Sequence, residues 1–274
     1  MTKDTATPLR VGHIGFANCT PLFLALEELG VAGVEYVTGV PTDLNRRLRC
    51  GEVDLSPSSS IEYLQHPDLY GFFPDLSISS IGAVRSVLLF SRVPLPALDG
   101  RRVALSAASG TSVQLLRVLL ETHRGITPQY VQQAEGADAV LWIGDRALRQ
   151  ARDGGWPHVY DLGELWFETT GTPFVFALWI CRRDAWQADP NGIRQFYRTL
   201  VRAQQLAYRS YPAFAARCAE AEWLGEGALL EYWQTISYDL TAWHLRGLRR
   251  FAEELVGLGV LGAVPDLGPL AVEE

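Results

Sequence analysis

The chain lacks long apolar runs, which disfavours a membrane-spanning helix. No stretch approaches about 18 uninterrupted apolar residues, and the longest, residues 174–181, has the length of a strand. The first ten residues, MTKDTATPLR, are polar and contain no apolar core of a secretory signal. We therefore expect a cytoplasmic protein with no membrane partner.

Metal and redox motifs are lacking as well. The four cysteines show no CxxC spacing, and the five histidines form no HExxH or similar pair. Buried free thiols in a reducing compartment are the simplest interpretation of such cysteines. We expect neither a metal ion nor a cofactor.

An excess of basic charge is also missing. With 24 Lys and Arg against 31 Asp and Glu, the formal net charge is −7. This balance disfavours nucleic acid as the main partner, because phosphate binding needs basic residues. It does not exclude a small organic anion, which local N–H and hydroxyl donors can hold.

The sequence does contain the alternation of an α/β protein. Apolar residues make up 48% of the chain, and short apolar runs alternate with amphipathic stretches through residue 180. From Asp184 onward the pattern is helical, and its aromatic residues are typical of helix packing. We predict strands at 9–14, 34–38, 53–56, 84–91, 102–105, 139–143, 159–160 and 174–181, and helices at 21–29, 41–49, 59–66 and 109–122.

Two of these strands suggest how the chain is divided. The strands at 84–91 and 174–181 bracket a second set of alternating elements. We therefore expect a first lobe made of residues 1–91 and 178–274, and a second lobe made of residues 92–177. A ligand would then lie in the cleft between the lobes.

The first candidate site residue follows the first strand. Asn18 lies in GFANCTP, where Thr20 is suited to cap the next helix and leaves the Asn18 amide available to a ligand. The alternative is an Asx-turn, in which Asn18 only supports its own loop.

Two serine-rich helix starts are candidates for holding a carboxylate. In SPSSSIE, Ser59 and Glu62 match a capping box, whereas Ser58 and Ser60 exceed what a cap requires. The second start, SAASGTS, offers exposed N–H groups and hydroxyls; a helix cap with a tight turn is its simpler explanation. Its candidate residues are Ser106, Ser109, Gly110, Thr111 and Ser112.

Two further polar residues lie beside predicted strands. Ser86 lies near the start of an apolar strand and has no GxSxG motif around it, so a serine hydrolase is disfavoured. Asp145 follows the strand at 139–143. An N-cap is its simpler role, and a contact with the substrate is the alternative that we retain.

Eight segments, in chain order, resemble the menaquinone-biosynthesis family, and within it the chorismate dehydratases more than the dihydroxynaphthoate synthases. They cover about residues 9–182, and their number and order make the resemblance specific. The segments are GHIGFANCTPLF, LNRRLRCGEVDLSPSSSIEY, PDLSISS, SVLLFSRVPL, LDGRRVALSAASGTSVQLL, LWIGDRAL, YDLGELW and TGTPFVFALW.

The resemblance implies a two-lobed type II periplasmic-binding-protein-like fold with a helical C-terminal segment. It implies a cofactor-free lyase that converts chorismate, a small dicarboxylate, to 3-[(1-carboxyvinyl)oxy]benzoate and water. It further implies that Asn18 and Ser86 are catalytic and that the serines and threonine of residues 106–112 cradle a carboxylate. No strong base is among these residues, so the enolpyruvyl carboxylate of the substrate is a candidate base.

Two alternatives share this fold. A solute-binding protein for a small organic anion would use the same cradles, but it normally carries a signal peptide. The related 1,4-dihydroxy-6-naphthoate synthase would act on cyclic dehypoxanthine futalosine instead of chorismate.

Overall fold

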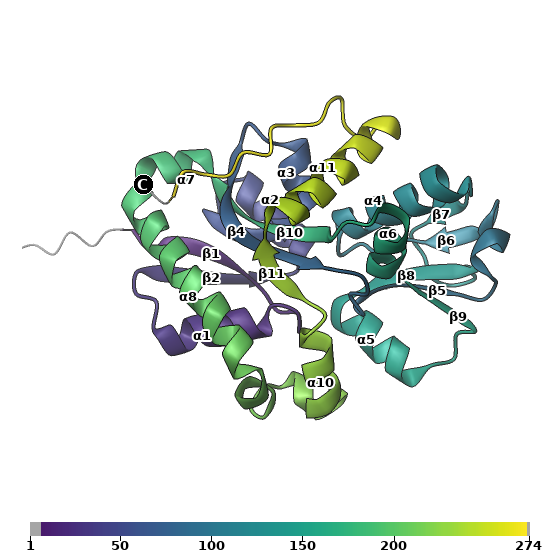
Figure 1. Cartoon of the computed structure of the whole chain (residues 1–274), viewed down its shortest axis with the longest axis horizontal. Helices are drawn as coiled ribbons and strands as arrows, with labels where there is room; N and C mark the ends of the chain where they lie inside the picture. Colours follow the sequence, from purple (N-terminus) through teal and green to yellow (C-terminus); the bar gives the residue numbers. More distant parts are fainter. Residues whose placement is uncertain (1–6, 273–274) are drawn as a thin grey trace, which may run out of the picture.

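A computed structural model describes residues 7–272 of the chain (Figure 1). Residues 1–6 and 273–274, which the sequence analysis assigned to the first lobe, lie outside the described residues; so does most of the polar N-terminal segment. The described residues form two α/β lobes, each built on its own sheet, which lie side by side in Figure 1.

The first lobe is built on a six-stranded sheet with the order β11-β4-β10-β3-β1-β2. β1 runs parallel to β2 and β3, whereas β10 is antiparallel to both β3 and β4, and β4 is antiparallel to β11. The strands are β1 (Leu9–Ile14), β2 (Val34–Gly39), β3 (Leu55–Ser59), β4 (Tyr70–Ser80), β10 (Phe174–Arg182) and β11 (Ser237–Leu240).

Helices cover this sheet, and most of them come from the C-terminal third of the chain (Figure 1). The long helix α8 packs against α1, and α11 packs against β10 and β11. The helices of this lobe are α1 (Thr20–Leu29), α2 (Pro41–Arg49), α3 (Ser60–Gln65), α7 (Arg183–Ala188), α8 (Pro190–Ala215), α9 (Glu220–Leu224), α10 (Glu226–Trp233) and α11 (Ala242–Gly257).

The second lobe is built on a five-stranded sheet with the order β7-β6-β8-β5-β9. Its strands are β5 (Val87–Ser91), β6 (Arg102–Ala104), β7 (Gln129–Val131), β8 (Ala139–Ile143) and β9 (His158–Asp161). Its helices are α4 (Gly110–Arg117), which a π-helical turn, η2 (Val118–Thr122), extends, α5 (Gly144–Asp153), α6 (Leu162–Thr170) and the short 3₁₀ helix η1 (Leu95–Leu98).

The lobe boundaries differ from the sequence expectation. β5 pairs with β8 and β9 of the second sheet, although the sequence analysis assigned residues through 91 to the first lobe. β10 pairs with β4 from Phe174 onward, so the return to the first lobe comes before residue 178. All five residues of β5 are buried. Such a run indicates a central strand but carries no signal for which sheet it joins.

Several predicted elements are confirmed, including the strands at 9–14 and 139–143 and the helix at 41–49. Strands β4, β7 and β11 were not predicted. The serine-rich end of β4 does not read as a strand, but its Ser77 and Ser79 hydroxyls donate to the carbonyls of Asp239 and Ser237 on β11. Polar side chains therefore find partners on the neighbouring strand, which only the tertiary fold supplies.

Two helix caps that were predicted in the first lobe are wrong. Cys19 occupies the N-cap of α1, and the Thr20 hydroxyl instead donates to Glu220. Ser59 makes no side-chain cap bond to α3. The buried Glu62 carboxylate pairs with Arg49 at 2.7 Å and accepts from the Tyr70 hydroxyl at 2.9 Å. A guanidinium compensates the buried carboxylate of Glu62 better than a capping bond would, so Glu62 pairs with Arg49 and does not cap the helix.

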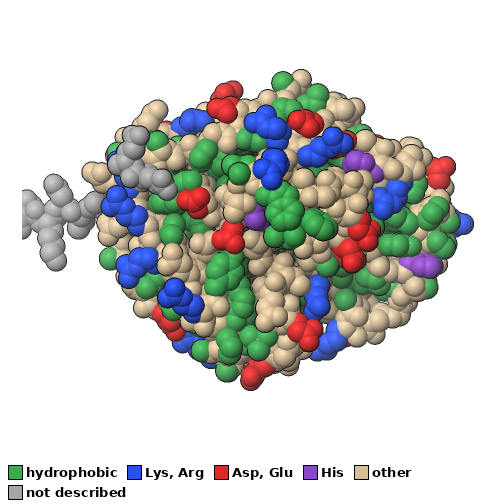
Figure 2. Space-filling view, viewed as in Figure 1, with side chains coloured by type: hydrophobic (Ala, Val, Ile, Leu, Met, Phe, Trp, Pro, Cys, Tyr) green, Lys and Arg blue, Asp and Glu red, His purple; other side chains and the backbone are tan. Residues whose placement is uncertain are grey.

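The surface view shows basic and acidic side chains interspersed over one face, without a large patch of either sign (Figure 2).

Among the described residues no helix is long and apolar enough to cross a membrane. No group of three or more His, Cys, Asp or Glu side chains within residues 7–272 is arranged to hold a metal ion. The four cysteines are free; three are buried as expected, and Cys50 is exposed.

Candidate functional site

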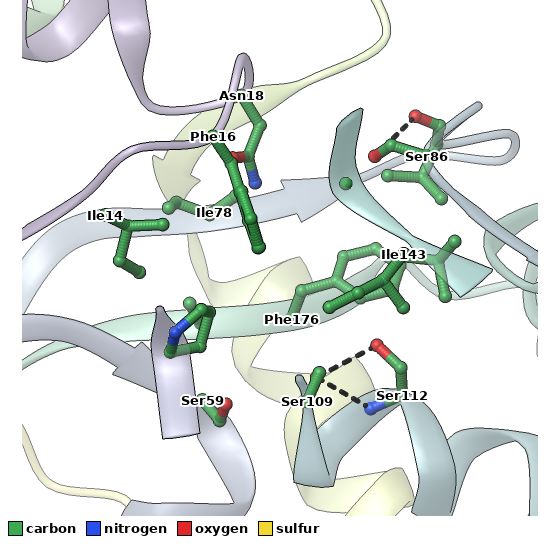
Figure 3. Close-up of a pocket in the computed structure, with 15 residues that line it drawn as sticks. Ile14, Phe16, Asn18, Ser59, Ile78, Ser86, Ser109, Ser112, Ile143 and Phe176 are labelled. Atoms are coloured by element: carbon green, nitrogen blue, oxygen red, sulfur yellow. Dashed lines mark hydrogen bonds between the residues drawn. The ribbon is translucent and has the colours of Figure 1, made fainter. Parts of the chain in front are cut away.

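A cavity lies where the two lobes meet, and both lobes supply its lining. Figure 3 shows Asn18 and Ser86 on one side of this cavity and Ser59, Ser109 and Ser112 on the opposite side. Apolar side chains lie between the two polar ends. The full lining is Ile14, Phe16, Asn18, Pro41, Ser59, Ile78, Val84, Ser86, Val87, Ser109, Ser112, Ile143, Gly144, Phe176 and Ala177.

Asn18 reaches the cavity from the loop that follows β1. Its Oδ1 atom is buried and has no hydrogen-bond partner among the described residues. The Asx-turn interpretation is therefore wrong, because an Asx-turn needs that oxygen to accept a backbone N–H bond. A buried amide oxygen without a partner is costly unless a ligand satisfies it, so Asn18 is suited to bind one.

Three hydrogen bonds fix the backbone of the Asn18 loop. The Ala17 N–H donates to Asp145 Oδ1 at 3.0 Å across the lobes. Trp233 Nε1 donates to the Ala17 carbonyl, and the Tyr238 hydroxyl donates to the Asn18 carbonyl, both at 2.8 Å. The backbone is thus held while the Asn18 side chain stays available, an arrangement that suits a fixed donor or acceptor.

Ser86 lies at the crossing between the lobes, just before β5. It is only 3% exposed, and its Oγ accepts a hydrogen bond from the Tyr232 hydroxyl at 2.9 Å. Its own hydroxyl lies 3.5 Å from the Val84 carbonyl, the only protein acceptor found for it among the described residues. The Ser86 proton therefore has no strong partner within the protein.

The Asp161 carboxylate holds the backbone immediately before Ser86. It accepts from the N–H groups of Val84 at 3.0 Å and Arg85 at 2.6 Å, and from Gly163 and Glu164 at the start of α6. Arg85 has a left-handed backbone with φ of 62°, a strained conformation that these bonds compensate. Burial raises the pKa of Asp161, and the four N–H bonds oppose that rise.

The other polar end is the start of α4. Ser109 is the N-cap: its Oγ accepts from the Ser112 N–H at 3.2 Å, and the two serine hydroxyls lie 3.0 Å apart. Ser59 faces this end from the first lobe (Figure 3). Hydroxyls beside the N-terminus of a helix favour negative charge, so this end suits a carboxylate.

The remaining predicted site residues do not line the cavity, and most support the contact between lobes. Thr111 Oγ1 accepts from the Ile61 N–H at 3.1 Å and lies 3.3 Å from Ser60 Oγ, both across the lobes. Within the first lobe, Ser60 donates to the Val175 carbonyl at 2.8 Å. Ser106 Oγ accepts from the Ala108 N–H within its own loop. Ser58 is buried, and its Oγ has no partner among the described residues.

Asp145 and Gly110 also act at the junction of the lobes. Asp145 is not the N-cap of α5, which is Ile143; its carboxylate holds Ala17 instead. Burial raises the pKa of Asp145, and the Ala17 N–H opposes this rise. A Cβ at Gly110 would lie 3.1 Å from Ile61 Cγ2, so the glycine permits close approach of α3 and α4.

Sequence reasoning missed the apolar walls and Tyr232. Phe16 and Phe176 flank the cavity, and Gly144 lets Phe16 approach α5 because a Cβ there would meet the Phe16 ring at 3.1 Å. The available signal was local: Phe16 is two residues from Asn18, and Gly144 directly precedes Asp145. Tyr232 is 146 residues from Ser86, and nothing in the sequence connects them.

None of the fifteen residues that line the cavity is charged. Its donors are hydroxyls, one carboxamide and backbone N–H groups, and it contains no His, Asp, Glu or Lys that would act as a base. The site can therefore bind and orient an anion and stabilise developing charge.

Two α/β lobes joined by two chain crossings, with a polar-ended cavity between them, define a binding-protein-like class. A protein of Archaeoglobus fulgidus has a similar structure, with a TM-score of 0.75, 19% identity and coverage of 95% of this chain and all of that one. The alkanesulfonate-binding protein SsuA of Xanthomonas axonopodis has a TM-score of 0.68 and 19% identity, and 97% of each chain is covered. These likenesses concern the fold alone.

Sequence comparison is more specific. Residues 9–256 match the family model described as menaquinone biosynthesis, and the chain belongs to that family. It is 38% identical to the chorismate dehydratase of Thermus thermophilus, over 90% of this chain and 95% of that protein. It is 31% identical to the 1,4-dihydroxy-6-naphtoate synthase of the same organism, over 76% of this chain and 74% of that protein.

Proposed function

We propose that this protein is a hydro-lyase that dehydrates chorismate to 3-[(1-carboxyvinyl)oxy]benzoate in menaquinone biosynthesis. The observation that carries the proposal is the cavity with two polar ends and apolar walls between them. Chorismate matches that layout, since it has a carboxylate on a six-membered ring and a second on its enolpyruvyl group. The 38% identity to a chorismate dehydratase supports the same substrate.

The reaction needs no cofactor in principle. The ring C–H beside the enolpyruvyl ether is conjugated through the diene to the ring carboxylate, so its removal gives a carboxylate-stabilised anion. Loss of the neighbouring hydroxyl as water then makes the ring aromatic. The protein mainly has to orient both carboxylates and stabilise the extended anion with fixed donors.

The two ends of the cavity divide these tasks. The ring carboxylate lies at the α4 end, where Ser109, Ser112 and the helix N-terminus offer hydroxyl and N–H donors. The enolpyruvyl carboxylate lies beside Asn18 and Ser86, takes the ring proton and passes it to the leaving hydroxyl, which departs as water. The cavity lining, which holds no ionisable side chain, supports this role for the substrate.

Apolar walls complete the mechanism. Phe16, Ile78, Ile143 and Phe176 exclude water from the ring, so neutral donors act with little screening. Cleavage of the C–O bond is favoured because it makes the ring of the product aromatic. We further propose a cytoplasmic location, which the free cysteines of the described chain support.

Turnover of chorismate by the purified protein tests the proposal. We expect chorismate to disappear while a new aromatic absorbance forms, and mass spectrometry should show a product that is lighter by one water. The rate should be unchanged in a metal chelator. Cyclic dehypoxanthine futalosine is assayed in parallel. Conversion of that compound alone would identify the naphthoate synthase, and tight binding of chorismate without conversion would identify a solute-binding protein; either result would contradict the proposal.

A further inference from the structure

One short C-terminal segment contacts both proposed catalytic residues. Residues 232–238 run from the end of α10 into β11. The Tyr232 hydroxyl donates to Ser86 Oγ, and the Tyr238 hydroxyl donates to the carbonyl of Asn18. Trp233 Nε1 donates to Ala17 between these two bonds. Residues more than 140 positions away in the chain therefore hold the Asn18–Ser86 end of the cavity.

The bond from Tyr232 reaches a side chain, whereas the other two reach the backbone. Tyr232 is 1% exposed, so its phenol would be costly to bury without a partner. A phenylalanine would fill the same space, which indicates that the hydroxyl has a role besides packing. Burial raises the pKa of Tyr232, so the phenol keeps its proton at neutral pH and can donate it.

The direction of this bond determines where the Ser86 proton points. Ser86 Oγ accepts from Tyr232 at 2.9 Å, which occupies one of its lone pairs. The hydroxyl has a single proton, and its protein acceptor among the described residues, the Val84 carbonyl, is 3.5 Å away. Because Ser86 also lines the cavity, the cavity is the direction in which that proton can find a strong acceptor.

We propose that Tyr232 is a positioning residue that fixes Ser86 so that its hydroxyl donates to the substrate carboxylate. The inference rests on the proposed function and deepens it, because it names the group through which Ser86 is oriented. Tyr232 does not touch the substrate: it is outside the cavity lining and acts only through Ser86. Polarisation of Ser86 by a buried phenol also strengthens the bond that Ser86 donates.

A double-mutant cycle tests this role. Tyr232→Phe is expected to lower kcat roughly tenfold, with a small change in KM, because one fixed hydrogen bond is lost. In the Ser86→Ala background the same substitution should change kcat less than about twofold, since its route of action is already gone. An equal loss in both backgrounds would overturn the proposal, because it would indicate a general structural effect.

Tyr63→Phe is the matched control. Tyr63 is equally buried, and its hydroxyl donates at 2.8 Å to the carbonyl of Asp266, away from the cavity. We expect a similar small loss in melting temperature for both variants, with unchanged kcat in Tyr63→Phe. A matching fall of kcat in the two variants would contradict a specific role for Tyr232. Rates are compared per folded molecule, with the folded fraction taken from near-ultraviolet circular dichroism.

Crystal structures separate this inference from the proposed function, because they require no turnover. In the wild type, Ser86 should adopt one rotamer with Tyr232 as its donor; in Tyr232→Phe it should occupy more than one. Ser86 in the same single rotamer in both proteins would overturn the positioning role, and so would a wild-type Tyr232 hydroxyl beyond about 3.5 Å from Ser86 Oγ. Failure of the wild type to convert chorismate would instead overturn the proposed function and leave the rotamer comparison decisive.

Discussion

The two ends of the cavity are built in different ways. At the α4 end, Ser109 and Ser112 are three residues apart on one helical turn. The capping bond from the Ser112 N–H to Ser109 Oγ also brings their two hydroxyls together. At the other end, Asn18, Ser86 and Tyr232 come from three distant segments, which tertiary contacts bring together. A local motif is sufficient to bind a carboxylate, whereas fixed donors for the reaction need support from the whole fold.

Removing a donor from the assembled end should have the largest effect. Ser86→Ala and Asn18→Ala are each expected to lower kcat on the order of 10²-fold, because the enolpyruvyl carboxylate that takes the ring proton is no longer held in place beside the ring C–H. Asn18→Ala should change the melting temperature little, and Ser86→Ala should lower it modestly, because the buried Tyr232 hydroxyl loses its acceptor. Ser91→Ala is the control: Ser91 is a buried serine at the other end of β5, and its hydroxyl donates to Val93.

Single-turnover rates with chorismate measure this loss directly. Near-normal rates in both variants would remove these residues from the mechanism. A collapse of the melting temperature in the variants, but not in Ser91→Ala, would identify their role as structural.

Asp161→Asn should have the next largest effect, because it disturbs the support of Ser86 without touching the cavity. The amide nitrogen cannot accept the bond that Asp161 Oδ2 receives from the Arg85 N–H. We expect a loss of about 1–3 kcal/mol in the free energy of unfolding, since a buried donor is left without its partner. Urea denaturation measures it, and unchanged stability would mean that the left-handed turn at Arg85 does not depend on Asp161.

The local end should respond most weakly. Ser112→Ala leaves the backbone N–H that Ser109 caps and removes one hydroxyl from the cavity. Product affinity should fall by about 1–1.5 kcal/mol, roughly tenfold, with kcat nearly unchanged. Calorimetry with the aromatic product gives the affinity. A fall in kcat as large as that of Ser86→Ala would contradict the assignment of binding to the α4 end and of chemistry to the Asn18–Ser86 end.

The same contrast explains what the sequence revealed. The α/β class and many elements follow from apolar periodicity, and the α4 cap follows from a motif within four residues. Asn18 and Ser86 line the cavity. Their assignment as catalytic residues came from the family resemblance and not from their spacing in the sequence. Thr111 and Asp145 matched the pattern of a ligand site equally well, yet they bond Ile61 and Ala17 across the lobes. Composition and spacing do not distinguish a polar group that meets a ligand from one that meets the other lobe.

The most direct test of the account compares Ser86→Ala with Ser112→Ala in the same preparations, measuring the single-turnover rate of chorismate dehydration and the affinity for the product. We predict that Ser86→Ala loses rate on the order of 10²-fold and at most about tenfold in affinity, since one hydrogen bond to the product carboxylate is lost, whereas Ser112→Ala loses roughly tenfold in affinity and keeps its rate. Equal losses of rate and affinity in the two variants would contradict the assignment of chemistry to one end of the cavity and binding to the other.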